Sequence, residues 1–271
     1  MMTLVVLDPV EILKRDVRAA VKDLSPKEVR FLVDAYYEMQ ENRKRAANQV
    51  LALGKAEEPN EVLGWLTEQN SRMEKNILGA LQDYADSKVL GVWAQSIRGI
   101  GPVITAGLMT HIDITKAPTV GHIWRFAGLD PTDKWGKGEK RPWDAGLKTL
   151  CWKVGESFVK VSNRDDDVYG KVYKERKVLE EKRNEAGLFA EQAAAKLRDV
   201  RIGKDTEAYK AYSKGKLPPA HVHARAKRYA VKLFLSSYHE VAFYCEYGTK
   251  PPKPYILTQP GHVHKFEVPN Q

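Results

Sequence analysis

The residues best suited to bind an anion lie in one short glycine-containing segment, residues 97–107. The positions of interest in it are Arg98, Gly99, Ile100, Gly101 and Thr105. Two glycines permit a tight turn with exposed backbone amides, and the proline that follows them is favoured in the first turn of a helix. Free N–H groups at a helix start bind phosphate oxygens, and the arginine adds a guanidinium suited to phosphate. The segment predicts a helix-hairpin-helix element that contacts a nucleic-acid backbone without reading its sequence. The alternative is an ordinary turn between two helices.

A second candidate segment interleaves cations with tryptophans. Its basic residues are Lys134, Lys137, Lys140 and Arg141, and its aromatic residues are Trp135 and Trp143. A loop of this composition can follow a phosphate backbone while its tryptophans stack on bases. The alternative is a solvated loop whose tryptophans anchor it to the core.

The third candidate is a basic helix face near the C-terminus. Its residues are Arg225, Lys227, Arg228 and Lys232, of which Arg225, Arg228 and Lys232 have the spacing i, i+3, i+7. The alanines between them allow a phosphate or another backbone to approach closely. Residues 196–271 hold 14 basic and 6 acidic residues, a net charge of +8, whereas residues 1–90 have a net charge of −2. A polyanion is therefore expected to meet the C-terminal part most strongly.

Together these segments resemble the helix-hairpin-helix transposase domain of insertion-sequence transposases that also carry a DEDD nuclease domain. Some members of that family are bridge-RNA-guided recombinases. The matching motifs are Gly99-Ile100-Gly101-Pro102, Ala127-Gly128-Leu129-Asp130-Pro131, the basic run from Lys137 to Arg141, and Leu147-Lys148. The resemblance covers roughly residues 60–187 and 220–240.

The resemblance implies nucleic-acid binding more directly than strand transfer. The family places a nucleophilic serine in the loop after the Leu-x-Pro turn, but residues 132–138 contain no serine. Thr132 carries a hydroxyl but lies too early in the loop. The first 90 residues predict helices rather than the strands of a nuclease domain. No catalytic residue is assigned.

Two further groups of residues could bind a metal ion. Asp165, Asp166 and Asp167 are adjacent, although such a cluster more often caps a helix. The pairs His221/His223 and His262/His264 would each point to one side of an extended segment, and with His239 or Cys245 they could bind zinc. The alternative is surface histidines, because the spacing of a known zinc motif is missing. No metal or other cofactor is predicted.

The periodicity of apolar residues predicts a mainly α-helical protein. The expected helices span residues 8–24, 25–53, 60–86, 165–187, 189–214 and 220–247, and the second and third of them form an antiparallel hairpin. The expected regions are a helical hairpin (1–90), a helix-hairpin-helix domain (91–187), a basic helical region (188–247) and a proline-rich arm (248–271).

Composition limits the class of protein. The 271 residues carry a formal net charge of +9 and are 43% apolar, so the chain can bury a core. Two cysteines, Cys151 and Cys245, are too few for a disulfide framework and indicate a reducing compartment. No signal peptide and no apolar stretch of about 18 residues is present. We therefore expect a cytoplasmic protein without a membrane partner.

Three functions fit the sequence. The first is binding of DNA, including branched DNA, or of structured RNA, in the recombination of a mobile element or phage. The second is a transposase or recombinase with a different nucleophile or a partner nuclease. The third is a helical interaction protein that forms homo-oligomers through its N-terminal hairpin.

Overall fold

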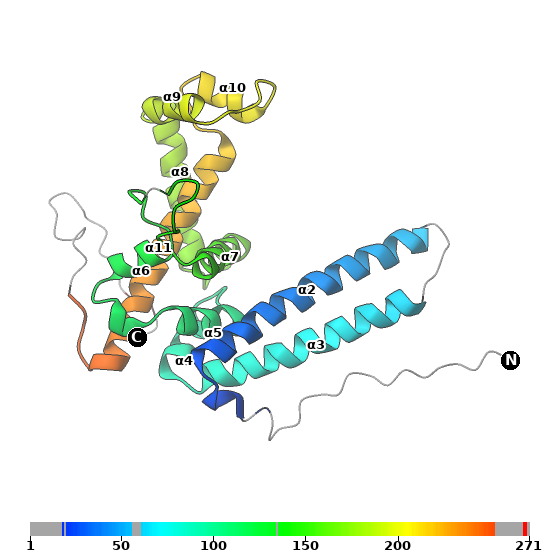
Figure 1. Ribbon diagram of the computed structural model, residues 1–271. Coiled ribbons are helices and arrows are strands. Elements are labelled where there is room, and N and C mark those ends of the chain that lie inside the picture. Colours follow the sequence, from blue (N-terminus) through cyan, green and yellow to red (C-terminus); the bar gives the residue numbers. More distant parts are fainter. Residues whose placement is uncertain (1–17, 19, 56–60, 134, 253–267, 270–271) are drawn as a thin grey trace. The chain divides into compact units, whose positions relative to one another are not determined.

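The computed structural model describes residues 18, 20–55, 61–133, 135–252 and 268–269. Within these residues the chain forms ten α-helices, two short 3-10 helices and no strand (Figure 1). The mainly α-helical fold is thus confirmed. The helix expected at residues 8–24 lies largely outside the described residues, apart from a 3-10 turn at Ala20–Asp23. Most of the proline-rich arm also lies outside them.

The chain divides into two compact units. Unit 1 comprises residues 1–95 and 101–113, and unit 2 comprises residues 96–100 and 114–271. One division falls between Ile100 and Gly101, inside the glycine hairpin. The hairpin therefore contributes residues to both units, and residue 90, where the composition changes, is not the boundary between them.

Unit 1 is built on two long helices that lie side by side, α2 (Pro26–Lys55) and α3 (Glu61–Asp86) (Figure 1). Their ends lie within two residues of the expected ones. A capping box starts α2: the backbone N–H of Ser25 donates to Glu28 Oε2 at 2.8 Å, and the backbone N–H of Glu28 donates to Ser25 Oγ at 3.4 Å.

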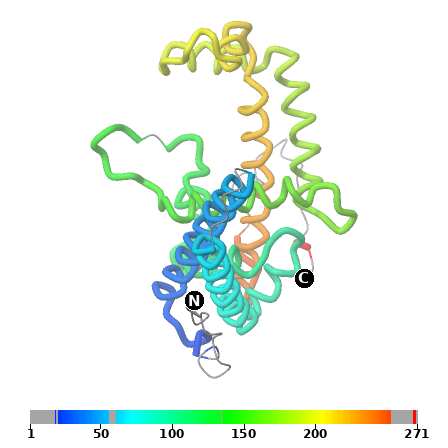
Figure 2. Tube along the Cα trace, turned by 90° about the vertical axis from the view of Figure 1, so that its right-hand side faces the viewer, coloured from blue at the N-terminus to red at the C-terminus, as the bar shows by residue number. Residues whose placement is uncertain are grey.

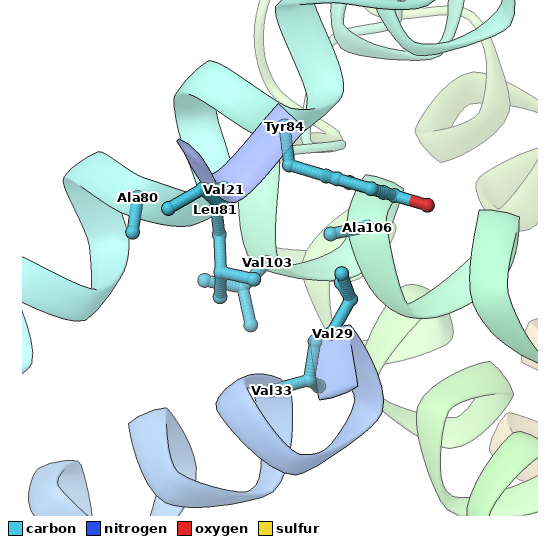
Figure 3. Packing of buried hydrophobic residues seen from close by; sticks show 8 residues of the cluster. All are labelled: Val21, Val29, Val33, Ala80, Leu81, Tyr84, Val103 and Ala106. Carbon is cyan, nitrogen blue, oxygen red and sulfur yellow. The ribbon is translucent and has the colours of Figure 1, made fainter. Parts of the chain in front are cut away.

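The core of unit 1 lies at one end of this pair of helices, where α5 (Pro102–His111) packs against both. Figure 3 shows the buried side chains: Val21, Val29, Val33, Ala80, Leu81, Tyr84, Val103 and Ala106. The short helix α4 (Val89–Ser96) connects α3 to the hairpin. Because α5 is apolar along most of its length, it acts chiefly as a core element.

Unit 2 is organised around the long helix α11 (Pro219–Tyr247). Helices α6 (Val120–Phe126), α7 (Ala145–Val161) and α8 (Tyr169–Glu185) pack against it, and α8 lies beside it in both views (Figures 1 and 2). Phe158 of α7 stacks on Tyr169 of α8 with ring centroids 5.1 Å apart and meets Phe234 of α11 at 5.5 Å. These aromatic contacts join three helices in one core.

The stretch from 189 to 214 is helical as expected, but it is divided into two helices by a loop. Helix α9 (Ala190–Asp199) ends before a loop that contains Gly203, and α10 (Glu207–Ser213) begins after Thr206. The Thr206 hydroxyl accepts the backbone N–H of Tyr209 at 3.1 Å, which caps the new helix. Gly187, with φ of +76°, follows the C-cap of α8 in the left-handed conformation that this position favours.

Candidate nucleic-acid interface

The glycine hairpin forms the tight turn that its sequence predicts. Gly99 has φ of +94°, a conformation that other residues rarely adopt. The backbone N–H of Ile100 donates to the Ile97 carbonyl at 2.9 Å, and both isoleucine side chains are buried. The Gly99 carbonyl accepts a hydrogen bond from the Ser157 hydroxyl of α7. The turn is therefore tied to the core of unit 2 on its carbonyl side.

The beginning of α5 belongs to unit 1. Gly101 is its N-cap residue, with φ of −95° and no side-chain cap, and Pro102 occupies the first turn. Thr105 has no exposed surface, and its hydroxyl has no hydrogen-bond partner within the described residues. Two of the predicted hairpin residues, Ile100 and Thr105, thus have buried side chains. At the start of α5 only backbone groups remain available to bind a ligand.

Arg98 is already paired with a carboxylate. Its Nε donates to Asp166 Oδ2 at 2.9 Å, and both side chains are more than half exposed. The hydrogen bond from Arg98 holds the pKa of Asp166 below its ordinary value. The charge that the sequence offered to a phosphate is therefore neutralised within unit 2.

The aspartate cluster acts as a helix cap at Asp167. Its Oδ1 accepts the backbone N–H of Gly170 at 3.0 Å at the start of α8. Burial raises the pKa of this carboxyl, whose side chain is almost wholly enclosed. Within the part of the chain that the structure describes, no group of three histidine, cysteine or acidic side chains is placed to hold a metal ion.

His221 and His223 lie on helix α11, within the helix expected over residues 220–247, so the shared orientation that an extended segment would give them does not occur. Residues two apart on a helix point in different directions. His221 Nδ1 lies 3.1 Å from the Tyr212 hydroxyl, and His223 Nδ1 lies 2.8 Å from the Tyr173 hydroxyl. Burial, aided by nearby cations, lowers the pKa of both histidines. Residues 262–264 lie outside the described residues.

The basic face of α11 is divided between two uses. Arg225 Nε donates to Glu180 Oε2 of α8 at 2.7 Å, and Lys227 pairs with Glu156 of α7. These two cations hold neighbouring helices together. By contrast, Arg228 forms no hydrogen bond or ion pair with the described residues.

Several cations of unit 2 lie over tryptophan rings. Four tryptophan rings each have a cation over them, at distances to the ring centroid of 5.0 Å for Trp135 with Arg141, 3.9 Å for Trp143 with Lys148, 5.7 Å for Trp152 with Lys227 and 4.4 Å for Trp124 with Lys232. A cation over an aromatic face is stabilised by the ring quadrupole. We call these eight residues, with Arg228, the tryptophan–cation cluster.

Local packing fixes the loop part of this cluster. The Trp135 and Trp143 rings meet edge to face with centroids 6.3 Å apart. Trp135 Nε1 donates to the Glu139 carbonyl at 2.8 Å. Gly128, with φ of +63°, lies so close to Trp143 that a Cβ there would be 2.8 Å from the ring. Figure 2 shows the segment between α6 and α7 as a loop that extends from the helices of unit 2.

The cations of the cluster repel one another. The pKa of Lys148 is lowered by desolvation and by the charges of Arg141 and Arg228. Burial lowers the pKa of Lys232, and Arg228 adds to the effect although Asp130 opposes it. Desolvation and Arg225 lower the pKa of Arg228. A set of crowded like charges with perturbed pKa values is the electrostatic setting of an anion site.

Sequence reasoning found part of this cluster. Arg141, Lys227 and Arg228 belong to it, and Lys137 and Lys140 lie exposed in the same loop. Lys134 lies outside the described residues. Trp124, Lys148 and Trp152 were not predicted to bind. Lys148 and Trp152 are four residues apart, which places them on one face of α7 and could have been noticed in the sequence.

Comparison with known proteins adds no relative. No protein-family model matches the chain, and no curated protein or solved structure is similar to it. None of the helices in the described residues has the length and apolar character needed to cross a membrane.

Proposed function

We propose that the protein binds nucleic acid through the tryptophan–cation cluster of unit 2. The observation that carries this proposal is a set of four cations that lie beside tryptophans or one another and form no ion pair within the described residues: Arg141, Lys148, Arg228 and Lys232. A polyanion that binds there relieves their mutual repulsion.

The resemblance to the transposase domain extends this proposal to the recombination of a mobile element or phage in the cytoplasm. The ligand would be DNA, including branched DNA, or structured RNA. Strand transfer is not part of the proposal, because residues 132–138 lack the serine that the resemblance requires.

The test is fluorescence-anisotropy binding over a salt series, with duplex, branched and single-stranded DNA and with structured RNA. Each phosphate contact lowers the slope of log affinity against log salt by about 0.9 on duplex DNA and by about 0.7 on a single strand. The double variant Arg228→Gln/Lys232→Gln should bind more weakly and with a shallower slope. The matched control is Lys44→Gln/Arg72→Gln, which removes two cations of unit 1 that pair with acidic residues on their own helices.

Salt-dependent binding that weakens in the cluster variant and persists in the control supports the proposal. An equal loss in both variants would show that net charge, and not this site, determines binding. The absence of binding to all four ligands at low salt would contradict the proposal.

We also propose that the hairpin of unit 1 joins a second copy of the chain. Leu51 near the end of α2 and Val62 near the start of α3 are 61% and 66% exposed, and Leu66 one turn later is 39% exposed. Apolar side chains clustered at a surface are typical of protein interfaces. Light scattering after size-exclusion chromatography should show an oligomer that Leu51→Lys/Val62→Lys dissociates; a monomeric parent protein contradicts this second proposal.

A further inference from the structure

We infer that the tryptophan–cation cluster takes unpaired nucleotides, with bases stacked on Trp135 and Trp152 and the phosphates between them held by the neighbouring cations. This inference rests on the proposed function and specifies its ligand. It depends on the exposure of two tryptophans, whereas the proposed function depends on the cations.

Trp135 is exposed although its polar atom is already satisfied. Its indole N–H donates to the Glu139 carbonyl, and the backbone N–H of Gly136 donates to Glu139 Oε2 at 2.8 Å, so the residues around the ring are tied together. Even so, 44% of Trp135 is exposed. A tryptophan that only anchors the loop would be buried like a core tryptophan; Trp93 of helix α4, for comparison, is 7% exposed. The loop therefore presents this ring to a ligand.

Trp152 is presented by a rigid helix. It is 59% exposed, while Cys151 beside it and Leu150 before it are buried in the core. Lys148 lies one helical turn earlier on the same face of α7 and covers the ring of Trp143. Aromatic and cationic side chains thus alternate from the loop onto α7, in the order Trp135, Arg141, Trp143, Lys148 and Trp152.

This alternation suits an unpaired strand better than a duplex. In a duplex the faces of the bases are covered by their neighbours in the stack, so exposed indole faces would gain nothing beyond what the cations provide. In an unpaired strand each base has a free face, and aromatic stacking platforms beside cations bind such strands with little sequence preference. Only an unpaired strand would therefore cover the exposed apolar surface of the two tryptophans.

The test compares single strands of equal length and charge, one with bases and one abasic at every position, and a duplex of the same sequence, all with the full chain. DNA and RNA versions of the base-bearing strand distinguish the two sources of unpaired nucleotides. The variant is Trp135→Leu/Trp152→Leu. The control is Tyr244→Leu, because Tyr244 is an exposed aromatic residue of unit 2 and no cation among the described residues lies over its ring.

We expect the base-bearing strand to bind at least about fivefold more tightly than the abasic strand, the lower limit for one stacked base. The double tryptophan variant should lose this preference and keep the salt slope, and the Tyr244→Leu protein should retain both. Equal affinity for the two single strands, or tighter binding of the duplex, would overturn the inference while leaving the proposed function intact. Failure of every strand to bind would instead remove the proposed function.

Discussion

Helix α11 carries two groups of cations that differ in what neutralises them. Arg225 lies against Glu180, whose carboxylate is 1% exposed and also meets Arg176 at 2.5 Å. Three residues further on, Arg228 has no carboxylate partner within the described residues, and Lys232 lies over a tryptophan. The basic face of α11 therefore contributes both to a structural region, centred on Glu180 of α8, and to the tryptophan–cation cluster.

The difference shows that basic residues in a sequence are not equivalent to available positive charge. Whether a cation of α11 is free depends on the residue that a neighbouring helix places opposite it. Glu180 on α8 neutralises Arg225, and Glu156 on α7 neutralises Lys227, so neither of these cations adds unpaired positive charge to the candidate site. If this distinction holds, changes in the two regions should affect stability and binding separately.

The largest expected effect is on stability, from Glu180→Gln. Removing one member of a buried ion pair leaves the partner charges uncompensated, which typically costs about 3 kcal/mol or more. Here Arg176 and Arg225 would lose their shared carboxylate. Urea unfolding followed by circular dichroism should show a lower midpoint.

The salt slope of nucleic-acid binding should not become shallower in the folded Glu180→Gln protein, because the cations of the cluster are unchanged and Arg225 is freed from its carboxylate. A flatter slope would show that the two regions are one electrostatic unit. Unchanged stability would show that the Glu180 contacts are dispensable.

The second effect is on binding, from Arg228→Met, which keeps an apolar stem but removes the charge. The slope of log affinity against log salt should become shallower by about 0.9 on duplex DNA, or about 0.7 on a single strand. Stability should stay equal or rise, because a cation that repels Lys148 and Lys232 is gone. Marked destabilisation together with unchanged binding would place Arg228 in the structural region.

The third effect is a difference in pH dependence. Burial acts to raise the pKa of Glu180, but hydrogen bonds and charges from Arg225 and Arg176 outweigh it, so the pKa lies below the ordinary 4.5. A carboxyl with a lowered folded-state pKa contributes stability that is present above 4.5 and is lost as pH falls through the folded value. The parent protein should lose more stability on acidification than Glu180→Gln, as measured by urea unfolding at several acidic pH values.

Lysines of the cluster should behave in the opposite sense. The pKa values of Lys148 and Lys232 are lowered from 10.5, so the unfolded state binds more protons than the folded state below that pH. Their contribution to stability therefore rises as pH increases toward 10.5, while their charge and nucleic-acid affinity fall. Anisotropy and urea titrations between about pH 8 and about pH 10 should show these opposing trends, and parallel trends would contradict them.

The smallest effect is expected from Asp166→Asn. The pair with Arg98 is exposed, so its loss should leave stability unchanged within error. Freed from its carboxylate, Arg98 becomes an available cation, and affinity for nucleic acid should rise slightly at low salt. A clear loss of stability would show that the pair of Arg98 and Asp166 stabilises the fold, as the contacts of Glu180 do.

The sequence predicted most helices of the fold, because their apolar periodicity and caps are local. Ser25 with Glu28 marked the start of α2, and Gly187 marked the end of α8. The break between α9 and α10 was missed, because a polar, alanine-rich stretch has too few apolar residues to show where one helix stops. The division of the chain inside the hairpin was also missed, because it depends on which core each residue joins.

The candidate site was predicted less completely, for the same physical reason. Arg141 and Arg228, which form no ion pair within the described residues, were among the predicted binding residues, but their spacing did not distinguish them from Arg98 and Arg225. The pairing of Arg98 with Asp166 spans 68 residues, and that of Arg225 with Glu180 spans 45. The local sequence pattern contains no information on contacts between residues so far apart in the chain.

The position of α11 in the chain has a consequence for the order of folding. Phe158 and Tyr169 are made early in unit 2, but the ring that packs against both, Phe234, is translated more than sixty residues after Tyr169. During synthesis α7 and α8 therefore keep aromatic surface exposed until α11 leaves the ribosome. Unit 1 has no such delay, since its core is closed by α5, and a translating ribosome would release it folded first.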